Sequence, residues 1–345
     1  MRLIVPMGGR GTRLRPFSHT TPKALLPVAG RPAIARSLGA FADALPRPVE
    51  EVVFVLNPAD RAGETPGQLA AACSALGVEA SFAVQDQPLG TAHAVASAGD
   101  KLDGEVLTVW SDTLFRARRR ADLDGPPPAD LVAWTTEVDD PRRFGVVVRD
   151  GSGRATGLLE KPPDARWTET LIGAYYVRQG GALRDVVADM MAAGRTGAGG
   201  EYQLTDALDG LVQAGATVRT EPVDEWLDVG TVPAYLDAVA RTLDREGHEP
   251  VARDGVTFRP PVYVAPGATV EASTVGPYAS IEAGATVSAS EVQNAVLFAD
   301  AAVEDSAVDG AVLGVRARLA GWTGTALLGD DASLGMPVQA RSPTA

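Results

Sequence analysis

The chain has 345 residues, 45% of them hydrophobic, which is enough to bury a full core in two domains or in one large domain with an appendage. Its formal net charge is −13 at pH 7, and this long-range field disfavours nucleic acid and anionic lipid as partners. No apolar run approaches the ~20 residues that cross a bilayer. Residues 1–5 lead into a glycine loop instead of a signal-peptide cleavage site, so we expect a cytoplasmic protein without a membrane partner.

The first 245 residues show strand-like and helix-like segments in alternation. A short apolar strand at 2–6 precedes a glycine-rich loop, and the spacing of Ile34, Leu38, Phe41 and Leu45 predicts a helix over 31–45. Further strands are expected at 51–56, 79–84, 105–110 and 130–138, a hairpin at 144–161, and helices near 66–76, 90–102, 181–193, 203–214 and 231–245. This order predicts a mainly parallel, doubly wound sheet with ligands at the carboxyl ends of its strands.

The pattern of apolar and small residues changes at about residue 259. From there single apolar residues recur at spacings of five or six, separated by Gly, Ala, Ser, Pro and acidic residues. They are Val264, Val270, Val275, Ile281, Val287, Val292, Leu297, Val303, Val308, Leu313 and Leu319. Three such steps make a coil of 16 or 17 residues, which is typical of hexapeptide-type parallel β-helices. The alternative is a few antiparallel strands with chance spacing.

The segment GGRGTRLRPFSHTTPK, residues 8–23, follows directly after the first strand. Glycines allow backbone N–H groups to approach phosphate oxygens, while Arg13 and Lys23 provide positive charge. The segment lacks the GK[ST] ending of a P-loop and the distant acidic residue of a dinucleotide fold, so it is a phosphate loop of another kind. Only three of the 31 basic residues are lysines, and Lys23 and Lys161 both lie in motifs, which indicates that a compact cation is required there.

Seven further sequence blocks follow this segment in order. They are QDQPLGTAHAV (85–95), VWSDTLF (109–115), DPRRFGVVV (140–148), GLLEKP (157–162), IGAYYV (172–177), GEYQLTDAL (200–208) and WLDVGT (226–231). Over residues 1–240 the set resembles the sugar-1-phosphate nucleotidyltransferase family. With the repeats included, the chain is most similar to long-form glucose-1-phosphate thymidylyltransferases.

This resemblance implies a Rossmann-like, doubly wound mixed sheet followed by a left-handed parallel β-helix. The expected parts are a catalytic domain at 1–242, a linker at 243–258, a β-helix at 259–322 and a tail at 323–345. The expected reaction is magnesium-dependent transfer of a nucleotidyl group from a nucleoside triphosphate, dTTP in the first place, to a sugar 1-phosphate, glucose 1-phosphate in the first place. Its products are the nucleotide sugar and pyrophosphate.

The resemblance also assigns roles to individual residues. Arg13, Lys23, Lys161 and Asp112 are expected to be catalytic, with Arg13 holding the triphosphate and Lys23 neutralising the α-phosphate. Asp112 and Asp228 are the expected Mg²⁺ ligands. Nucleotide contacts are expected from Gly8, Gly9, Gly11, Thr12, Arg13, Gln85, Gly90 and Thr91, and sugar-phosphate contacts from Gly145, Glu160, Lys161, Tyr176 and Trp226.

Most of these roles have a structural alternative. Asp112 could cap the turn after the strand at 105–110, and Asp228 could cap the helix that begins near Thr231. Glu160 and Lys161 could form a solvated pair on the hairpin. Gln85 could be an ordinary polar residue at a strand end.

Other positions weaken the assignment of the nucleobase. Pro6 and Met7 stand where the family usually has leucine and alanine, and proline offers no N–H to a base. Ser111 replaces the glycine that commonly precedes the metal aspartate, and Tyr176 fits a core position better than a ligand position. UTP with glucose 1-phosphate and GTP with mannose 1-phosphate therefore remain open.

Two further functions are alternatives from other classes. A non-catalytic regulatory subunit that binds a nucleotide sugar would normally have lost the charged set, which this chain keeps. A bifunctional enzyme with acetyltransferase chemistry in the β-helix would need a base such as histidine in the coils, and no histidine follows His248. We therefore expect a structural or oligomerising β-helix, and a homo-oligomer.

Overall fold

The computed structural model describes residues 1–7 and 12–335. Two compact units divide the chain: residues 1–10 with 33–227, and residues 11–32 with 228–345. The second unit therefore combines the carboxyl-terminal third of the chain with most of the glycine-rich segment. No helix among the described residues is long and apolar enough to span a membrane.

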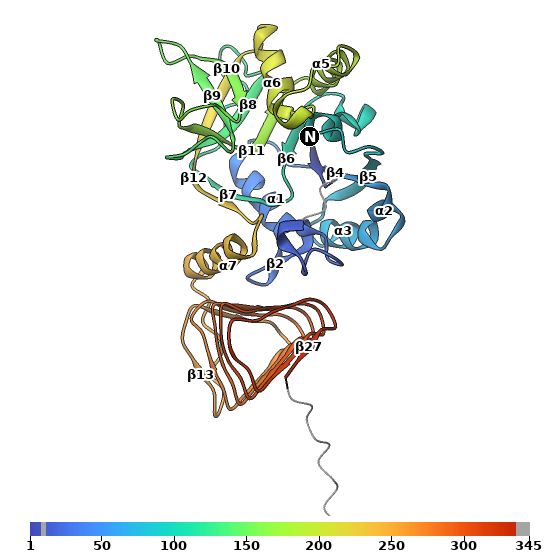
Figure 1. Ribbon diagram of the computed structural model, residues 1–345. Coiled ribbons are helices and arrows are strands. Elements are labelled where there is room, and N and C mark those ends of the chain that lie inside the picture. The colour runs from blue at the N-terminus through green and yellow to red at the C-terminus, as the bar shows by residue number, and fades with distance from the viewer. Residues whose placement is uncertain (8–11, 336–345) are drawn as a thin grey trace, which may run out of the picture. The chain divides into compact units, whose positions relative to one another are not determined.

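The first unit is built on a ten-stranded mixed sheet (Figure 1). Its parallel half has the order β5-β4-β1-β6. The central strand β1 is apolar, and Leu3, Ile4 and Val5 are fully buried, as expected for a strand covered on both faces. These strands are β1 (Arg2–Pro6), β4 (Glu51–Leu56), β5 (Glu79–Val84) and β6 (Val106–Val109).

The other half of the sheet departs from the predicted parallel arrangement. Its long strand β11 (Glu169–Val177) is antiparallel to both β6 and β8, whereas β12 is parallel to β8. β9 and β10 form the predicted hairpin and join the sheet through β11. The remaining strands are β7 (Thr113–Ala117), β8 (Leu131–Glu137), β9 (Gly145–Arg149), β10 (Ala155–Glu160) and β12 (Val218–Asp228).

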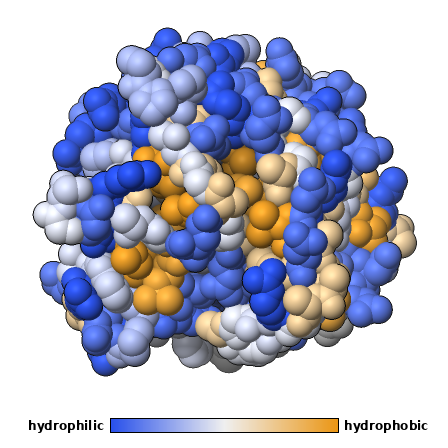
Figure 2. Space-filling view, turned by 90° about the horizontal axis from the view of Figure 1, so that it is seen from above, coloured by the Kyte–Doolittle hydropathy of each residue, from blue (hydrophilic) through white to orange (hydrophobic). Residues whose placement is uncertain are grey.

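Helices pack against both faces of this sheet. Ile34, Leu38 and Phe41 are buried on one side of α1 (Ala33–Ala44), and Phe41 packs edge-on against Phe115 and Trp134. A second core forms where α4 (Thr91–Ala96), α5 (Gly180–Ala192) and α6 (Leu204–Gln213) meet the sheet. Two helices, α2 (Pro58–Ala62) and α3 (Thr65–Ser74), and two 3₁₀ turns, η3 (Gly99–Leu102) and η4 (Ala198–Gly200), complete the unit. Seen from above, one face is largely hydrophilic, with hydrophobic residues gathered in hollows (Figure 2).

One predicted helix is divided in the structure. The segment 90–102 forms α4 and then η3 instead of one continuous helix. Gly99, at the junction, has φ +59°, a left-handed conformation that interrupts a right-handed helix.

The second unit contains a β-helix of three parallel five-stranded sheets, visible as triangular coils in Figure 1. One sheet has the strands β13 (Thr257–Phe258), β16 (Thr274–Val275), β19 (Glu291–Gln293), β22 (Ala307–Asp309) and β25 (Thr323–Gly324). The second has β14 (Val262–Val264), β17 (Ala279–Ile281), β20 (Ala295–Leu297), β23 (Val312–Leu313) and β26 (Leu327–Leu328). The third has β15 (Thr269–Glu271), β18 (Thr286–Ser288), β21 (Ala302–Glu304), β24 (Arg318–Ala320) and β27 (Ser333–Leu334).

The periodic apolar residues fill the interior of these coils, as the spacing predicts. Ten of the eleven belong to the buried core of the β-helix, and Val264 packs against it. The predicted fold class is therefore confirmed: a Rossmann-like mixed sheet followed by a parallel β-helix, whose sheets are consistent with the left-handed form.

The coils extend beyond the range expected from the sequence. β25, β26 and β27 form a last coil at 323–334, a stretch that the apolar spacing places in the tail. In this coil Gly324 pairs with Val308, so an interior position lacks the side chain that reveals the repeat elsewhere.

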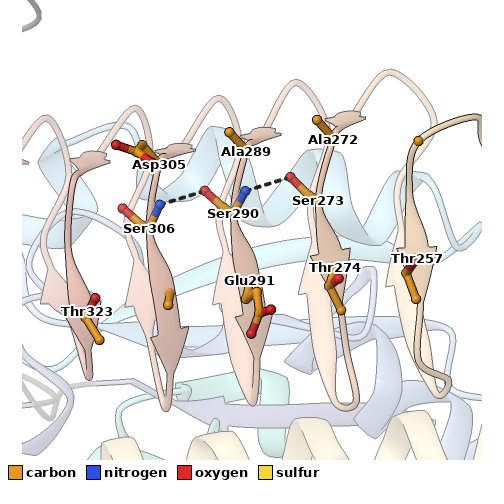
Figure 3. Close-up of a pocket in the computed structure, with 12 residues that line it drawn as sticks. Thr257, Ala272, Ser273, Thr274, Ala289, Ser290, Glu291, Asp305, Ser306 and Thr323 are labelled. Atoms are coloured by element: carbon orange, nitrogen blue, oxygen red, sulfur yellow. Dashed lines mark hydrogen bonds between the residues drawn. The ribbon is translucent and has the colours of Figure 1, made fainter.

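One outer edge of the β-helix carries a ladder of serines (Figure 3). The hydroxyl oxygen of Ser273 accepts a bond from the Ser290 backbone N–H at 3.0 Å, and that of Ser290 accepts from Ser306 N–H at 3.1 Å. Each hydroxyl also donates to a carbonyl two residues earlier, at 2.7 Å. The ladder lies in a polar groove of about 450 Å³ that has no histidine in its lining. Its serines therefore serve to hold successive coils together.

The rest of the second unit consists of short elements and one long helix. Thr231 caps α7 (Val232–Glu246) by accepting a bond from the Ala234 N–H at 3.4 Å. The segment 12–32 forms two 3₁₀ turns and a small hairpin: η1 (Thr12–Leu14), η2 (Lys23–Leu25), β2 (Pro27–Val28) and β3 (Arg31–Pro32).

Candidate active site

The glycine-rich segment carries two of the predicted catalytic cations. Arg13 lies in η1 with its side chain exposed, and Lys23 begins η2. Thr12 is the first residue of η1. The predicted contacts of Gly8, Gly9 and Gly11 lie outside the described residues.

Asp228 and Arg13 belong to the same unit and approach the same glycine. The carboxylate oxygen Oδ1 of Asp228 accepts a hydrogen bond from the Gly230 N–H at 2.9 Å. A Cβ atom on Gly230 would lie 2.7 Å from that oxygen and 3.3 Å from the Arg13 guanidinium. Because Thr231 caps α7, the helix-capping role considered for Asp228 is filled by another residue.

The other predicted Mg²⁺ ligand, Asp112, lies in the tight turn between β6 and β7. Residues before and after Asp112 are hydrogen-bonded to the backbone of β11. The Trp110 N–H donates to the Gly173 carbonyl at 3.2 Å, and the Thr113 hydroxyl donates to the Ile172 carbonyl at 3.1 Å. Gly173 has φ +79°, and a Cβ atom there would overlap the Trp110 ring. The sequence after β6 therefore presents Asp112 on a rigid turn at the carboxyl end of the strand.

The predicted base-contacting residues form one cluster within the first unit. Gln85 is 6% exposed, and its amide nitrogen lies 3.1 Å from both the Gly90 carbonyl and His93 Nδ1. Gly90 has φ +129°, and a Cβ atom there would lie 2.6 Å from the backbone nitrogen of Tyr202. The structure therefore brings Gln85 and Gly90 together and requires a glycine at position 90.

Thr91 ties this loop to the start of α6. Its hydroxyl accepts a bond from the Leu204 N–H at 2.8 Å and donates to the Gln203 side chain at 3.2 Å. The Ala92 N–H donates to the Tyr202 carbonyl at 2.8 Å. Thr91 thus fixes the position of the loop as well as being a predicted nucleotide contact.

Gly145 and Glu160 face each other at the end of the β9–β10 hairpin. The Thr205 hydroxyl donates to Glu160 Oε2 at 2.7 Å. A Cβ atom on Gly145 would lie 3.0 Å from the Thr205 hydroxyl oxygen and 3.1 Å from Glu160 Oε2. A Cβ atom there would also lie 2.9 Å from Leu171 Cδ1, so a side chain at position 145 would displace these groups. Glycine therefore allows the Glu160 carboxylate and the Thr205 hydroxyl to pack against the backbone.

Lys161 and Trp226 both contact Phe144, the residue before β9. Lys161 has φ +48°, and its N–H donates to the Phe144 carbonyl at 2.8 Å. The Phe144 ring packs edge-on against Trp226, with ring centroids 5.2 Å apart. The indole nitrogen of Trp226 is buried and has no hydrogen-bond acceptor among the described residues.

The structure does not bring Tyr176 to this hairpin. Its ring is fully buried, and its hydroxyl donates to Glu105 Oε1 at 2.6 Å, next to the amino end of β6. Burial and this hydrogen bond raise the pKa of Tyr176. The neighbouring Tyr175 is the tyrosine close to Glu160. Burial of Tyr175 raises its pKa, and the negative charge of Glu160 raises that pKa further.

Three residues near Glu160 were not singled out from the sequence: Thr205, Tyr175 and Asp206. Burial raises the pKa of Asp206, and the nearby Glu160 and Asp209 raise it further. Thr205 and Asp206 lie within the block GEYQLTDAL, and Tyr175 lies within IGAYYV. The sequence therefore indicates these blocks without indicating that these three residues belong to the site.

The donor set can be tested against magnesium. Among the described residues no three His, Cys, Asp or Glu side chains cluster as a metal cage would require. Magnesium is commonly held by one or two carboxylates together with substrate phosphates and water. Asp112 and Asp228 are each a ligand of the type that this chemistry uses.

Comparisons with known proteins identify the family of the chain. The family model described as nucleotidyl transferase matches residues 3–245. A glucose-1-phosphate thymidylyltransferase of Streptomyces griseus is 32% identical over 341 residues, covering 88% of each chain, and one of Streptomyces antibioticus is 29% identical, covering 91% of this chain and 92% of its own. A solved structure of UDP-glucose pyrophosphorylase complexed with UDP-glucose covers 71% of this chain and 98% of its own with a TM-score of 0.56, and at 19% identity it supports the fold alone.

The protein belongs to the nucleotidyl transferase family. It is an enzyme that transfers a nucleotidyl group to a sugar 1-phosphate. The predicted family and type of activity are confirmed, and the individual site residues remain predictions.

Proposed function

We propose that the enzyme transfers the nucleotidyl group of dTTP to glucose 1-phosphate, releasing pyrophosphate, with Mg²⁺ held by Asp112 and Asp228. In this proposal residues 1–242 form the catalytic domain, and the reaction takes place in the cytoplasm. The relatives from two Streptomyces species named as glucose-1-phosphate thymidylyltransferases support this choice of substrates.

The observation that carries the proposal is the hydrogen-bonding site around Gly145. The Glu160 carboxylate, held at 2.7 Å by Thr205, accepts sugar hydroxyls, and glycine at position 145 lets this pair lie close to the backbone. Trp226, which packs against Phe144 beside this hairpin, contacts the sugar phosphate. Lys161, the residue after Glu160, neutralises that phosphate.

Gln85 favours a pyrimidine of the thymine or uracil type. Its amide nitrogen is directed at Gly90 and His93, which fixes the plane of the side chain. The carbonyl oxygen of the same amide accepts the N3–H of thymine or uracil. Cytosine offers an acceptor at that position, so the same geometry disfavours CTP.

The chemistry needs no nucleophilic side chain. A sugar phosphate is largely dianionic near neutral pH, since its second pKa is ~6, and its oxygen attacks the α-phosphorus directly. The new O–P bond forms as the bond from the α-phosphorus to the bridging oxygen breaks, and pyrophosphate leaves with that electron pair. Arg13, Lys23 and Lys161 align the phosphates and neutralise charge in the transition state, and the bound magnesium supplies further positive charge on the triphosphate.

A substrate panel tests this proposal. Pyrophosphate release is measured with dTTP, UTP, CTP, GTP and ATP against glucose 1-phosphate and mannose 1-phosphate, with and without a chelator. We expect dTTP with glucose 1-phosphate to give the highest kcat/KM, UTP to rank second, and the chelator to abolish release. A best pair of GTP with mannose 1-phosphate would refute the substrate assignment, and undiminished release with the chelator would refute the metal.

A further inference from the structure

One face of the β-helix differs from the other two. Strands of the sheets that contain β15 and β16 have outward residues that are exposed or partly exposed. In the sheet that contains β14, both β17 and β20 are buried at all three positions. This face is therefore covered from outside the coils.

The buried outward residues of this face are Ser280, Val296 and Val312, each 0% exposed. Their neighbours Ile281 and Leu297 belong to the interior core, and adjacent residues of a strand point to opposite sides. None of the three belongs to that interior core. They consequently face a covering layer.

The covering contacts include an aromatic pair that joins the β-helix to the segment 12–32. Phe298, which follows Leu297 at the end of β20, is 1% exposed but does not belong to the interior core. Its ring lies 6.0 Å from the ring of Phe17, which is 0% exposed. The two rings therefore bury each other, with Phe17 four positions after Arg13.

Polar contacts continue along the same face. The Gly30 N–H donates to Glu282 Oε1 at 3.3 Å, and the Ser280 hydroxyl donates to the same oxygen at 2.8 Å. On the last coil the Thr20 hydroxyl bonds to Asp330. Thr20 precedes Lys23 in the chain and Gly30 follows it, so the segment is held before and after this lysine.

Two further positions show how closely the segment approaches the coils. Gly30 has φ +78°, and a Cβ atom there would overlap the ring of Tyr263. A Cβ atom on Gly329 would lie 2.9 Å from Pro16. The segment is thus supported from the first coil to the last.

The segment cannot hold this shape by its own hydrogen bonds. Its helical parts, η1 and η2, have three residues each, and its hairpin strands have two. Single 3₁₀ turns and two-residue strands are not stable alone in water. A rigid external surface is needed to fix the side chains that the segment carries.

We propose that this face of the β-helix is a positioning surface for the triphosphate-binding segment, with Phe298 and Glu282 as positioning residues for Arg13 and Lys23. The inference rests on the proposed roles of those two cations. The β-helix then contributes to triphosphate binding in the same chain, in addition to any role in assembly.

The test compares Phe298→Ala with Leu319→Ala. Both variants remove a large buried apolar group from the β-helix, but Leu319 belongs to the interior core of the coils. We expect Phe298→Ala to raise the KM for dTTP about tenfold, which is below the ~100-fold that misplacement by ~1 Å can cost. The KM for glucose 1-phosphate should stay within about twofold, because the predicted sugar contacts lie outside the segment 12–32. Leu319→Ala should lower the melting temperature and leave both KM values within about twofold.

Glu282 provides a second variant pair that disturbs packing less. Glu282→Gln keeps an oxygen that accepts from the Gly30 N–H, so it should retain the parent KM for dTTP, while Glu282→Ala should raise it several-fold. Hydrogen exchange of peptides covering residues 12–32 should accelerate in Phe298→Ala and in Glu282→Ala only. This readout does not depend on activity.

The outcomes separate this inference from the proposed function. An active parent whose Phe298→Ala variant matches Leu319→Ala in KM and in exchange would overturn the positioning surface alone. A parent that releases no pyrophosphate with any pair would overturn the proposed function and, with it, the role of the surface in catalysis. A selective rise in the KM for dTTP together with faster exchange over 12–32 supports the inference.

Discussion

Replacing Thr205 by valine removes one hydroxyl from the site and keeps the shape of the side chain. Thr205 is 5% exposed at the start of α6, and its hydroxyl donates to Glu160 Oε2 at 2.7 Å. The donor and the carboxylate are close to the position that a Cβ atom on Gly145 would occupy. We therefore expect Thr205→Val to misorient Glu160 and to weaken binding of the sugar.

The size of the effect follows from the kind of hydrogen bond. A bond to a charged group contributes about 1.5–3 kcal/mol, which corresponds to a factor of roughly 10 to 150. The loss should appear in kcat/KM for glucose 1-phosphate. The KM for dTTP should stay within about twofold, because the predicted nucleotide contacts are other residues.

Two control variants separate the hydroxyl from the packing. Thr205→Ser keeps the donor and should retain most of the parent kcat/KM. Thr242→Val makes the same chemical change in α7, where the buried hydroxyl has no hydrogen-bond partner among the described residues, and it should leave kinetics unchanged. The assay is pyrophosphate release against glucose 1-phosphate concentration, with melting temperatures recorded for each variant. Equal sugar kinetics in Thr205→Val and the parent would refute the positioning of Glu160.

The other predictions concern the charged set. Asp112→Asn and Asp228→Asn should each lower kcat at least ~100-fold, because each removes an anionic ligand from a hard cation, while the circular dichroism spectrum stays unchanged. Unchanged turnover in either variant would exclude that aspartate as a ligand. Lys23→Arg and Lys161→Arg should lose up to ~100-fold in rate although the charge is kept, because a planar guanidinium displaces the reacting oxygens. Lys101→Arg, on a residue paired with Glu51 and outside every motif, should match the parent, and three equally active arginine variants would refute the need for lysine.

Local periodicity was sufficient to predict most of the elements of the fold. The helix α1 and the strands β4 and β6 lie where apolar spacing places them, because α1 buries one stripe and both strands are buried on both faces. The direction of β11 was not predictable, because a buried apolar run is the same in a parallel and an antiparallel strand. Gly99 was a visible signal, but a single glycine inside a helical pattern does not by itself show a break.

The site was predictable at the level of motifs and less so at the level of side chains. Glu160 and Gly145 were identified through the resemblance, and the structure places them opposite each other. Tyr175 and Tyr176 are adjacent on one strand, so only the sheet decides which of them faces Glu160. Thr205 could not be linked to Glu160 from the sequence, because 45 residues separate them along the chain.

The sequence of the β-helix does contain a signal for its covered face. The strands β15, β18 and β21 read TVE, TVS and AVE, with one apolar interior residue between outward residues that tolerate water. The strand β20 and the residue after it read AVLF, four apolar residues in succession. A strand of a coil needs apolar residues on its inner side only, so Val296 and Phe298 indicate a second buried side. In this chain the aromatic partner on that side is Phe17, within the segment that carries Arg13 and Lys23, and this connects the repeat pattern to the proposed chemistry.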